Sequence, residues 1–319
     1  MDLSIIIINW NSKDFLKKCL KSIKEETFSI SYEIIVVDNA SFDGCKKILY
    51  SIFPDAIFIQ SKKNIGFAKG NNLGAQYASG SVLFFLNPDT EISDRAIEKL
   101  FKTINKITNC GIIGAKLLNN DGSIQTSCIQ AFPKIANQIL DTEFLRVLAP
   151  KKPLWGIAPL FSASKEPSEV DVVSGAALMI KKEIFEEVGC FSTDYFMYSE
   201  DVDLCYKVHK KGWKVLYDPN SVIIHHGGGS SSQVKINTFA AVMMLESRWR
   251  FFRKFYPQWY CWMYRFLMGF VSIIRIIILL FSWPYFTMCG KMKSANARLK
   301  KWYARLRWAI GRNKGQSGF

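Results

Sequence analysis

Val82-Leu83-Phe84-Phe85-Leu86-Asn87-Pro88-Asp89-Thr90 is the stretch that decides the fold. Five consecutive apolar residues predict a strand buried on both faces, as in a parallel sheet covered by helices. Pro88 removes a ladder donor and fixes φ, so the strand must end before it. Asp89 is thereby placed at the carboxyl end of a core strand, where open α/β sheets bind ligands and where a carboxylate suits a hard divalent cation. An ordinary Asn-Pro-Asp turn is the alternative.

The first 110 residues alternate between strand and helix patterns. Strands are predicted at residues 3–9, 32–38, 56–60 and 81–86, and helices at 13–26, 43–53, 67–78 and 93–106, with Ser93 as an N-cap. This alternation predicts an α/β fold with right-handed crossovers and a mostly parallel sheet flanked by helices.

The next segments are less regular. Residues 112–118 and 123–130 flank Asn119-Asn120-Asp121-Gly122, a hairpin signal, and residues 132–167 are predicted to be irregular. A strand is expected at 170–181, and a helix from a cap at Ser199 to Lys211, with Gly212 ending it. Two short strands are predicted at 213–217 and 221–226, and helices from residue 236 onward.

The positive charge of the chain is concentrated in its last 73 residues. The chain has 42 Lys and Arg against 27 Asp and Glu, and the last acidic residue is Glu246. Fifteen Lys and Arg follow it, so the first 246 residues are neutral and the tail carries the net charge of +15. Basic tails usually bind nucleic acid or anionic membranes, and the adjoining apolar run favours a membrane and not nucleic acid.

That apolar run covers residues 266–289 and is long enough to span a bilayer, which needs about 20 residues. Arg275 near its middle and Pro284 oppose a continuous span. Trp302, Tyr303 and Trp308 stand among the cations of residues 291–314, a mixture suited to the membrane interface. Interfacial or re-entrant binding, a true span, and a helix covered by protein are all left open.

Eight cysteines are scattered through the chain without a Cys-x-x-Cys pair. Most stand inside apolar runs, as buried free thiols do. The apolar run at residues 5–8 is too short to be a signal peptide. Both features predict a reducing, cytoplasmic environment.

Four polar groups follow predicted strands and are expected at one edge of the sheet. They are Asn9-Trp10-Asn11, Asp38-Asn39-Ala40-Ser41, the loop from Asn64 to Asn72 with Gly66, and Asn87-Pro88-Asp89. A carboxylate there can accept hydrogen bonds from a base or ribose, and a glycine-containing loop before a helix suits an anion. Each turn alone has a structural explanation. Four on one edge predict a ligand site.

Two further groups lie downstream. Ser199-Glu200-Asp201-Val202-Asp203 places three carboxylates in the first turn of a helix. One interpretation is that these carboxylates complement the helix dipole. The other is that one of them is a general base, because Leu204, Cys205 and Val208 would face the core and leave the neighbouring carboxylates free to point into a cleft. His225-His226 precedes the Gly227–Ser230 loop, and one of these histidines could complete a metal site.

These motifs, in this order, resemble glycosyltransferase family 2, and most closely its rhamnosyltransferase-like branch. The resemblance covers about residues 1–235 and includes Ile5–Asn11, Asp38-Asn39, the Asn64 loop, Asn87-Pro88-Asp89, Ser174-Gly175-Ala176, Glu200–Leu204 and His225–Ser230. One departure is Asn87, which stands where the family often has the first Asp of an Asp-x-Asp motif. A single carboxylate at that point implies that metal arrives with the donor.

The resemblance implies a GT-A fold and an inverting transfer from a nucleotide-diphosphate sugar. It assigns Asn9, Asn11, Asp38, Asn39, Asn64, Gly66 and Asn87 to the donor, and Gly175, Ala176 and Asp203 to the acceptor side. Asp89 would hold Mg²⁺ or Mn²⁺, with His225 or, as the alternative, His226. Asp201 would be the general base, with Glu200 or Asp203 positioning it.

The expected protein is therefore a metal-dependent hexosyltransferase with two regions. Residues 1–110 would form the nucleotide-sugar half and 111–235 the acceptor half of one domain, and residues 236–319 a helical membrane-associating region. It would transfer a sugar, with rhamnose as a candidate, to a lipid-linked or polysaccharide acceptor at the cytoplasmic face of the membrane. The alternatives are a sugar nucleotidyltransferase and a non-catalytic membrane-binding protein that keeps the fold.

Overall fold

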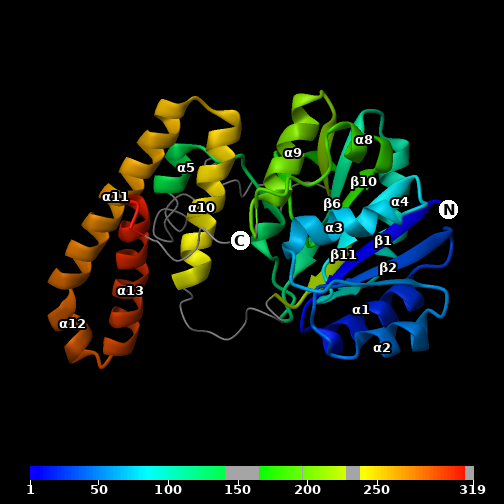
Figure 1. Ribbon diagram of the computed structural model, residues 1–319, viewed down its shortest axis with the longest axis horizontal. Coiled ribbons are helices and arrows are strands. Elements are labelled where there is room, and N and C mark those ends of the chain that lie inside the picture. The colour runs from blue at the N-terminus through cyan, green and yellow to red at the C-terminus, as the bar shows by residue number, and fades with distance from the viewer. Residues whose placement is uncertain (141–164, 196, 228–237, 313–319) are drawn as a thin grey trace. The chain divides into compact units, whose positions relative to one another are not determined.

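The computed structural model describes residues 1–140, 165–195, 197–227 and 238–312 (Figure 1). The chain forms two compact units. The first comprises Met1–Phe132, Arg146–Phe196 and Glu200–Ser232, and the second comprises Pro133–Leu145, Met197–Ser199 and Gln233–Phe319.

The first unit is built on one mixed sheet with the strand order β3-β2-β1-β4-β10-β6-β11-β5, and β8 pairs with β11 beside this path. The strands are β1 (Leu3–Asn9), β2 (Tyr32–Asp38), β3 (Ile57–Gln60), β4 (Val82–Leu86), β5 (Thr90–Ile92), β6 (Cys110–Leu118), β8 (Ser168–Glu169), β10 (Ala177–Lys181) and β11 (Lys214–His225). A small second sheet pairs β7 (Ile129–Gln130) with β9 (Val172–Val173).

The directions of these strands determine which loops share an edge. Strands β3, β2, β1 and β4 are parallel to one another, and β10 is antiparallel to both β4 and β6. Because β6 and β11 are parallel, β1, β2, β4, β6 and β11 all run the same way. Their carboxyl ends therefore lie at one edge of the sheet, together with the start of β10. The expected mostly parallel sheet is confirmed, with antiparallel β10, β5 and β8 added to it.

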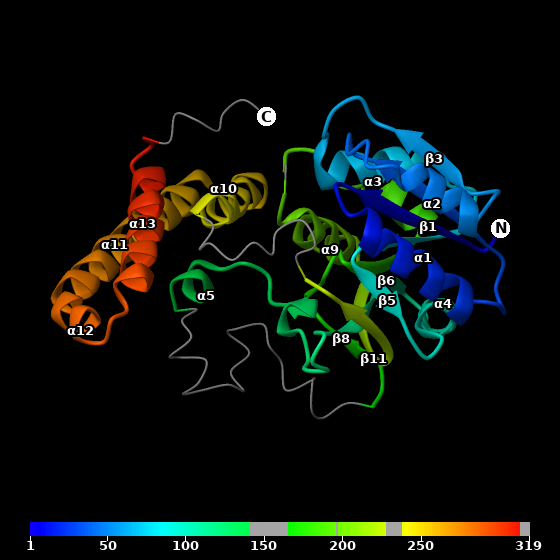
Figure 2. The same cartoon turned by 90° about the horizontal axis from the view of Figure 1, so that it is seen from below.

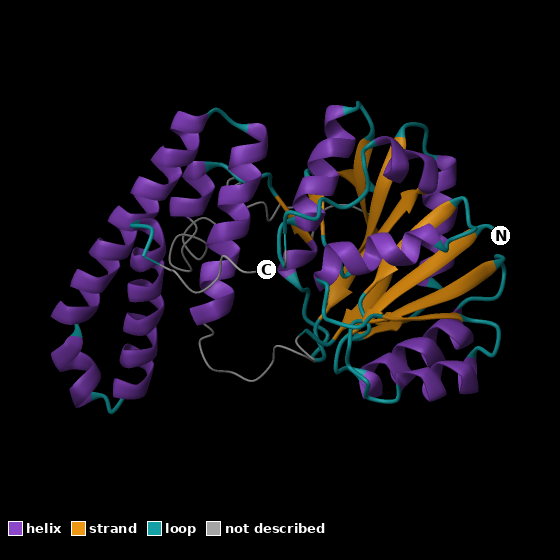
Figure 3. Ribbon diagram, in the orientation of Figure 1, coloured by secondary structure: helices purple, strands orange, loops and turns teal. Residues whose placement is uncertain are grey.

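Helices lie on both faces of this sheet (Figure 3). They are α1 (Lys13–Glu26), α2 (Cys45–Ile52), α3 (Gly66–Gln76), α4 (Ala96–Lys106), α8 (Lys182–Glu187) and α9 (Glu200–Lys210). Every residue of β1 and β4 is buried, as the apolar runs predict. Helix α3 lies close to β1 because Gly74 presents no side chain there: a Cβ would stand 2.6 Å from Ile6 Cγ2.

Both predicted serine caps are wrong. Arg95, in the left-handed region at φ 54°, precedes α4, and Ser93 Oγ instead donates to the Val222 carbonyl at 3.0 Å. The buried Ser199 Oγ makes no hydrogen bond within the described part of the chain. The predicted stop at Gly212 is confirmed: its φ is +85°, and the Trp213 amide bonds back to the Val208 carbonyl.

Three strand predictions need correction. Beyond the Asn119–Gly122 turn, residues 123–130 make a single bridge, a 3₁₀ turn at Thr126–Cys128 and β7, because β7 pairs with β9 and not with β6. The strand at 170–181 is broken into β9 and β10. The two short strands near 213–226 form one strand, β11, with an irregularity between Asp218 and Val222 that accommodates Pro219.

The second unit is helical among its described residues. It contains α5 (Ile135–Leu140), α10 (Thr238–Phe255), α11 (Gln258–Phe281), α12 (Trp283–Met288) and α13 (Met292–Ala309). The apolar run at 266–289 is not one helix, because α11 ends at Phe281 and Pro284 stands in the first turn of α12, where its missing amide is tolerated. Helix α5 shows that the expected irregular stretch is helical at its start, while residues 141–164 and 228–230 lie outside the described residues.

Candidate active site at the carboxyl edge of the sheet

The strand directions bring the predicted site residues to one edge of the first unit. Asn9 ends β1, Asp38 ends β2, Asn87 follows β4 and His225 ends β11. Gly175 and Ala176 precede β10, whose first residue, Ala177, pairs with Leu86. Chain segments far apart in the sequence therefore meet at this edge.

The ends of β1 and β2 are joined by a buried hydrogen-bond network. Asn9 Nδ2 donates to Asp38 Oδ1 at 2.9 Å, and Asp38 Oδ2 accepts from Gln60 Nε2 at 2.7 Å. Burial alone would raise the pKa of Asp38, but hydrogen bonds from Ser41, Gln60 and Asn9 outweigh it and leave that pKa below its usual value. Asp38 is therefore an ionised, rigidly held acceptor. Asn11 is exposed, and its amide donates to Ser41 Oγ at 2.9 Å.

Asn39 connects β2 to the loop before α3. Its Nδ2 donates to Asn64 Oδ1 at 2.8 Å, and its Oδ1 accepts from the Ile65 amide at 2.8 Å. Asn64 Oδ1 also accepts from the Gly66 amide at 2.9 Å. Gly66 has φ +82°, a conformation that favours glycine. The loop is thus fixed from both sides at the N-terminal end of α3.

Asp89 and His225 face each other. Asp89 Oδ1 lies 3.3 Å from His225 Nε2, and Asn87 Nδ2 lies 3.3 Å from the same ring nitrogen. His225 Nδ1 is 2.6 Å from Gln125 Oε1. The Gln125 amide orientation is determined because its Nε2 donates to Asn119 Oδ1 and to the His225 carbonyl. Gln125 Oε1 can only accept, so Nδ1 carries a proton and the neutral ring presents an unprotonated Nε2.

This pair fits a divalent cation. Two neighbouring ligands of an octahedral ion are separated by about 3 Å when each metal–ligand bond is ~2.1 Å, close to the Asp89–His225 separation. A histidine that ligates metal usually donates its other ring N–H to a fixed acceptor, as His225 does to Gln125. One carboxylate oxygen and one imidazole nitrogen suit Mn²⁺ better than Mg²⁺.

His226, the alternative ligand, points elsewhere. Its Nε2 lies 2.7 Å from Glu91 Oε1 and its Nδ1 lies 2.5 Å from Asn120 Oδ1, while Phe15 packs against the ring. The His226 amide donates to the Asp89 carbonyl at 2.9 Å, so the residue supports the turn through its backbone. The geometry favours His225 over His226 beside Asp89.

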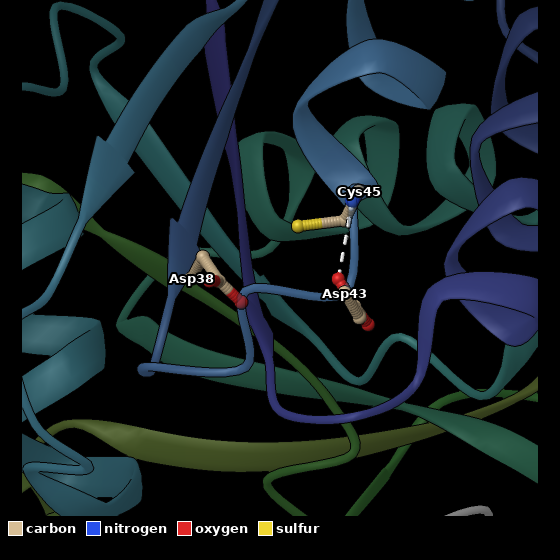
Figure 4. Close-up of side chains that lie close together, drawn as sticks. All are labelled: Asp38, Asp43 and Cys45. Atoms are coloured by element: carbon tan, nitrogen blue, oxygen red, sulfur yellow. Dashed lines mark hydrogen bonds between the residues drawn. The ribbon is translucent and has the colours of Figure 1, made fainter.

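A second acidic group, Asp38, Asp43 and Cys45, places three possible ligand atoms within 4.8 Å of one another (Figure 4). Burial, reinforced by Asp38 and Asp43, raises the pKa of the Cys45 thiol far above its usual value. Asp43 accepts hydrogen bonds from the Lys13 and Cys45 amides. A protonated thiol and carboxylates already bonded to amides do not suit a cation, so this group is a hydrogen-bonded turn.

The acidic helix α9 contributes Asp201 to the same edge. Asp201 Oδ2 accepts from the Gly175 amide at 3.1 Å, and the Asn87 amide donates to the Ala176 carbonyl at 2.9 Å. A Cβ on Gly175 would lie 3.4 Å from Asp201 Cβ and 3.5 Å from the Phe67 ring. Asp201 at the start of α9 is half-buried, and Leu204, Cys205 and Val208, which follow it at helical spacing, are fully buried, as predicted.

The two neighbouring carboxylates differ from Asp201. Glu200 is buried at the start of α9. Asp203 has no exposed surface, and it accepts from Ser192 Oγ and from Tyr195 Oη, with Lys207 Nζ at 3.4 Å. This placement favours a role for Asp203 in fixing α9 and gives it no direct access to an acceptor.

Sequence reasoning missed two residues of this edge. Gln60 ends β3, so the rule that found Asp38 at the end of β2 would also have found it. Gln125 lies in a segment expected to be a strand, and no pattern around it indicates that it would orient His225. The turn at Asn119–Gly122 brings Gln125 next to His225 at the end of β11.

Known families match this chain over most of its length. A model described as glycosyl transferase family 2 matches residues 4–189, and one described as glycosyl transferase family group 2 matches residues 154–312. The first match covers more than half of the chain. The chain therefore belongs to glycosyl transferase family 2.

Individual relatives are distant. The low-salt glycan biosynthesis hexosyltransferase Agl10 of Haloferax volcanii is 28% identical over 215 residues, covering 66% of this chain and 62% of the relative. The N-acetylglucosaminyl-diphospho-decaprenol L-rhamnosyltransferase of Mycobacterium tuberculosis is 26% identical over 256 residues, covering 75% and 80%. The chain thus matches less than two thirds of the length of the first relative.

Solved structures show the same fold. The mannosyltransferase PcManGT from Pyrobaculum calidifontis, in complex with GDP-Man and Mn²⁺, aligns with a TM-score of 0.59 at 15% identity, covering 97% of this chain and 86% of that one. GalNAc-T7 with UDP, GalNAc and Mn²⁺ aligns with a TM-score of 0.60 at 16% identity, covering 98% and 58%. The GT-A-like α/β fold expected from the resemblance is confirmed.

Proposed function

We propose that this protein is an inverting, divalent-metal-assisted glycosyltransferase that uses a nucleotide-diphosphate sugar. The observation that carries the proposal is the connected edge of the sheet. There the Asp89–His225 pair is linked through the Asn87–Ala176 hydrogen bond to the Gly175–Asp201 contact. A site for a diphosphate and a candidate base are thereby held by one rigid backbone. Family membership argues against the two alternatives, a nucleotidyltransferase and a non-catalytic protein.

The donor half of the site would be the network around β1, β2 and α3. The ionised Asp38 accepts from the base or ribose, with Asn9 holding its carboxylate in place. Asn39 fixes the Asn64–Gly66 loop against the nucleotide. Such prearranged groups reduce the loss of conformational entropy on binding.

In the transfer step, the acceptor hydroxyl oxygen attacks the anomeric carbon opposite the diphosphate. The bond from that carbon to the diphosphate oxygen breaks, and Asp201 takes the hydroxyl proton. One general base suffices for this inversion. The Gly175 amide fixes one Asp201 oxygen at 3.1 Å, and the buried Glu200 borders the same helix start. The fully buried Asp203 positions α9 by accepting hydrogen bonds from Ser192 and Tyr195.

Asp89 and His225 would hold Mg²⁺ or Mn²⁺ on the diphosphate. When bound, the ion neutralises the charge that develops on the leaving group. Because Asn87 replaces a second carboxylate, the protein supplies few charged ligands. We therefore expect tight metal binding only together with the nucleotide, whose phosphate oxygens complete the coordination.

We further propose a lipid-linked or polysaccharide acceptor at the cytoplasmic face of the membrane, in cell-envelope glycan synthesis. The mycobacterial relative's name includes a diphospho-decaprenol acceptor and a rhamnosyl donor group, and the tail of this chain has an apolar and basic composition. Rhamnose is one candidate sugar. The relatives and solved structures carry several different sugars and nucleotides in their names, so the donor must be found by screening.

The test is turnover of a donor panel by the full chain. Release of nucleoside diphosphate is measured with dTDP-rhamnose and the common UDP- and GDP-sugars, each with Mn²⁺, with Mg²⁺ and with EDTA, in the presence of membrane lipid extract. The proposal predicts one preferred donor and loss of release with EDTA. Release of pyrophosphate from a nucleoside triphosphate and a sugar phosphate, with no turnover of any sugar nucleotide, would overturn it.

A further inference from the structure

The second unit has an apolar outer stripe along α11. One helix of the described residues, Gln258–Phe281, is long and apolar enough to cross a membrane by length and composition. Its exposed positions recur every three or four residues, so they form a single face, and only Gln258 among them is polar. The exposed apolar members are Trp259, Trp262, Met263, Phe266, Phe270, Ile273, Ile274, Ile277, Ile278, Leu280 and Phe281. Phe266 is 72% exposed and Phe281 is 84% exposed.

Arg265, Ser272 and Arg275 of α11 lie off the exposed stripe, and each has a partner. Arg265 donates to the Trp308 and Ala309 carbonyls at 2.8 and 2.9 Å, at the carboxyl end of α13. The Arg275 guanidinium lies 5.8 Å from the Trp302 ring centroid. Ser272 Oγ bonds to the Met268 carbonyl within the helix. The charge of Arg275, which in the sequence opposed a continuous span, is therefore absent from the exposed stripe.

Helix α13 runs antiparallel to α11 along most of its length. Arg265 near the start of α11 contacts the end of α13, and Arg275 further along contacts Trp302 nearer its middle. Figures 1 and 2 show α11, α12 and α13 as a hairpin with the two long helices side by side. Trp308 also donates to Glu246 Oε2 of α10 at 2.9 Å, which ties the hairpin to the rest of this unit.

This pairing decides between spanning and lying on a membrane. The exposed residues of α13 include Lys293, Arg298, Lys300 and Arg307, and this helix contains no acidic residue. If α11 crossed the bilayer, its partner would cross beside it and would place Arg305 and Arg307, which lie opposite the middle of α11, near the middle of the hydrocarbon, where charges are strongly disfavoured. If both helices lie in the plane of the interface, the α11 stripe meets acyl chains and the α13 cations reach lipid phosphates.

We infer that the α11–α13 hairpin is a monotopic docking surface for an anionic bilayer, lying in the plane of the interface without crossing it. The occupant is a lipid surface and not protein because one hairpin joins an aromatic, apolar stripe on α11 to the cationic helix α13. Exposed Trp259 and Trp262 at one end of the stripe are side chains that favour the interface. The inference extends the proposed membrane association and is independent of the sugar chemistry.

A native cysteine at the far end of the hairpin provides the topology test. Cys289 is exposed, Cys190 is half-buried and the other six cysteines are buried. In a C190S background, a membrane-impermeant maleimide is added to sealed inside-out vesicles of the expression host, with C190S/C289S as the control. We expect Cys289 to be labelled without detergent, from the same side as an exposed cysteine introduced in α1 (K17C). Labelling of Cys289 only after detergent would establish a span and overturn the inference.

The charge test uses vesicle flotation of the full chain. The variant K293E/R298E/K300E should bind phosphatidylglycerol-containing vesicles at least about 100-fold more weakly, because each cation near an anionic surface contributes about fivefold. The control K17E/K21E/K47E makes the same charge change on exposed residues of α1 and α2 and should bind normally. Turnover of the sugar nucleotide in solution should be equal in both. No vesicle binding by the unmodified chain, together with a dimer in sedimentation, would assign the stripe to a second copy and overturn the inference.

Discussion

The two units arrange polar and apolar side chains in opposite ways. In the α/β unit, the strands are apolar and covered, and the polar residues gather at one edge, where Asn9, Asp38 and Asn39 are buried. There Asn9 Nδ2 donates to Asp38, and the Asn39 backbone amide donates to the Asn9 carbonyl. In the helical unit, the cations Arg265 and Arg275 turn inward on α11, and its outer face is apolar. A rigid polar edge is suited to bind and orient a small charged ligand, whereas an uncovered apolar face is suited to a surface without fixed geometry.

Substitutions in the two units should therefore affect different properties of the protein. Substitutions at the edge of the sheet should alter chemistry or donor affinity by large factors and leave membrane binding unchanged. Substitutions on the hairpin should do the reverse.

The largest expected effect is on transfer in Asp201→Asn. The amide cannot take the acceptor proton, so kcat should fall by about 10²–10⁴-fold, the usual contribution of a general base. Donor affinity, measured by titration calorimetry, and vesicle binding should both be unchanged. Asp14→Asn, an exposed acid in the first turn of α1, is the matched control. A D201N enzyme with full transfer would remove Asp201 from the role of base.

The next effect distinguishes the two adjacent histidines. His225→Gln removes the ring nitrogen that lies 3.3 Å from Asp89, so the concentration of Mn²⁺ needed for half-maximal turnover should rise by at least about 10–100-fold. His226→Gln, whose ring bonds to Glu91 and Asn120, should change this concentration much less. Equal shifts in the two variants would contradict the assignment.

A third prediction concerns acid stability of the α/β unit. Burial opposes ionisation of Glu98, but the Ser29 and Phe28 amides and Arg95 outweigh it and lower its pKa to about 2, from an ordinary 4.5. The stabilisation is therefore fully present above pH 4.5 and is lost as the pH falls towards 2. Glu98→Gln should lower the free energy of unfolding by about 1–3 kcal/mol at pH 7.

The pH dependence provides the control for that variant. Urea unfolding followed at a series of pH values should show the E98Q difference shrinking between pH 4.5 and 2. Vesicle binding by the helical unit should not follow this change. A difference in stability that is constant from pH 7 to pH 2 would show that ionised Glu98 contributes nothing.

The smallest effect is expected for one side chain of the stripe. Phe270 is 53% exposed, so Phe270→Ser should leave folding intact and weaken vesicle binding by about tenfold, the value of losing much of one buried aromatic side chain. Tyr50→Ser, at 40% exposed on α2, is the control for general loss of an aromatic residue. Flotation measures both. Turnover in solution should be unchanged, and an equal loss of binding in the two variants would contradict a docking role for the stripe.

Much of the site at the edge of the sheet could be predicted because the sequence marks where each strand ends. Apolar runs that stop at Asn9, Asp38 and Asn87 define the carboxyl ends of parallel strands, and the shared direction of those strands then brings the polar residues together. The structure agrees at β1, β2 and α1 to the residue. Pro88 and Gly212 act through backbone geometry that no tertiary contact can override, which is why both boundaries were predictable.

What could not be predicted depends on contacts between distant segments. Strand β7 pairs with β9, which lies more than 40 residues further along the chain, and local propensity does not distinguish this pairing from one with β6. The cap at Ser93 failed because its hydroxyl donates to the distant Val222 carbonyl, and the buried Ser199 hydroxyl makes no capping hydrogen bond within the described residues. Which histidine faces Asp89 depends on the contact between Gln125 and His225, and the position of the Arg275 side chain depends on the packing of α13 against α11. Neither contact is visible in the local sequence.

The central claim is that the edge of the sheet binds a nucleotide-diphosphate together with a metal ion. Titration calorimetry of the full chain should show weak binding of Mn²⁺ alone and tight binding of the donor's nucleoside diphosphate only when Mn²⁺ is present. In Asp89→Asn this cooperativity should be lost, while vesicle binding is retained. Tight Mn²⁺ binding without nucleotide, or the same cooperativity in the D89N variant, would contradict the account.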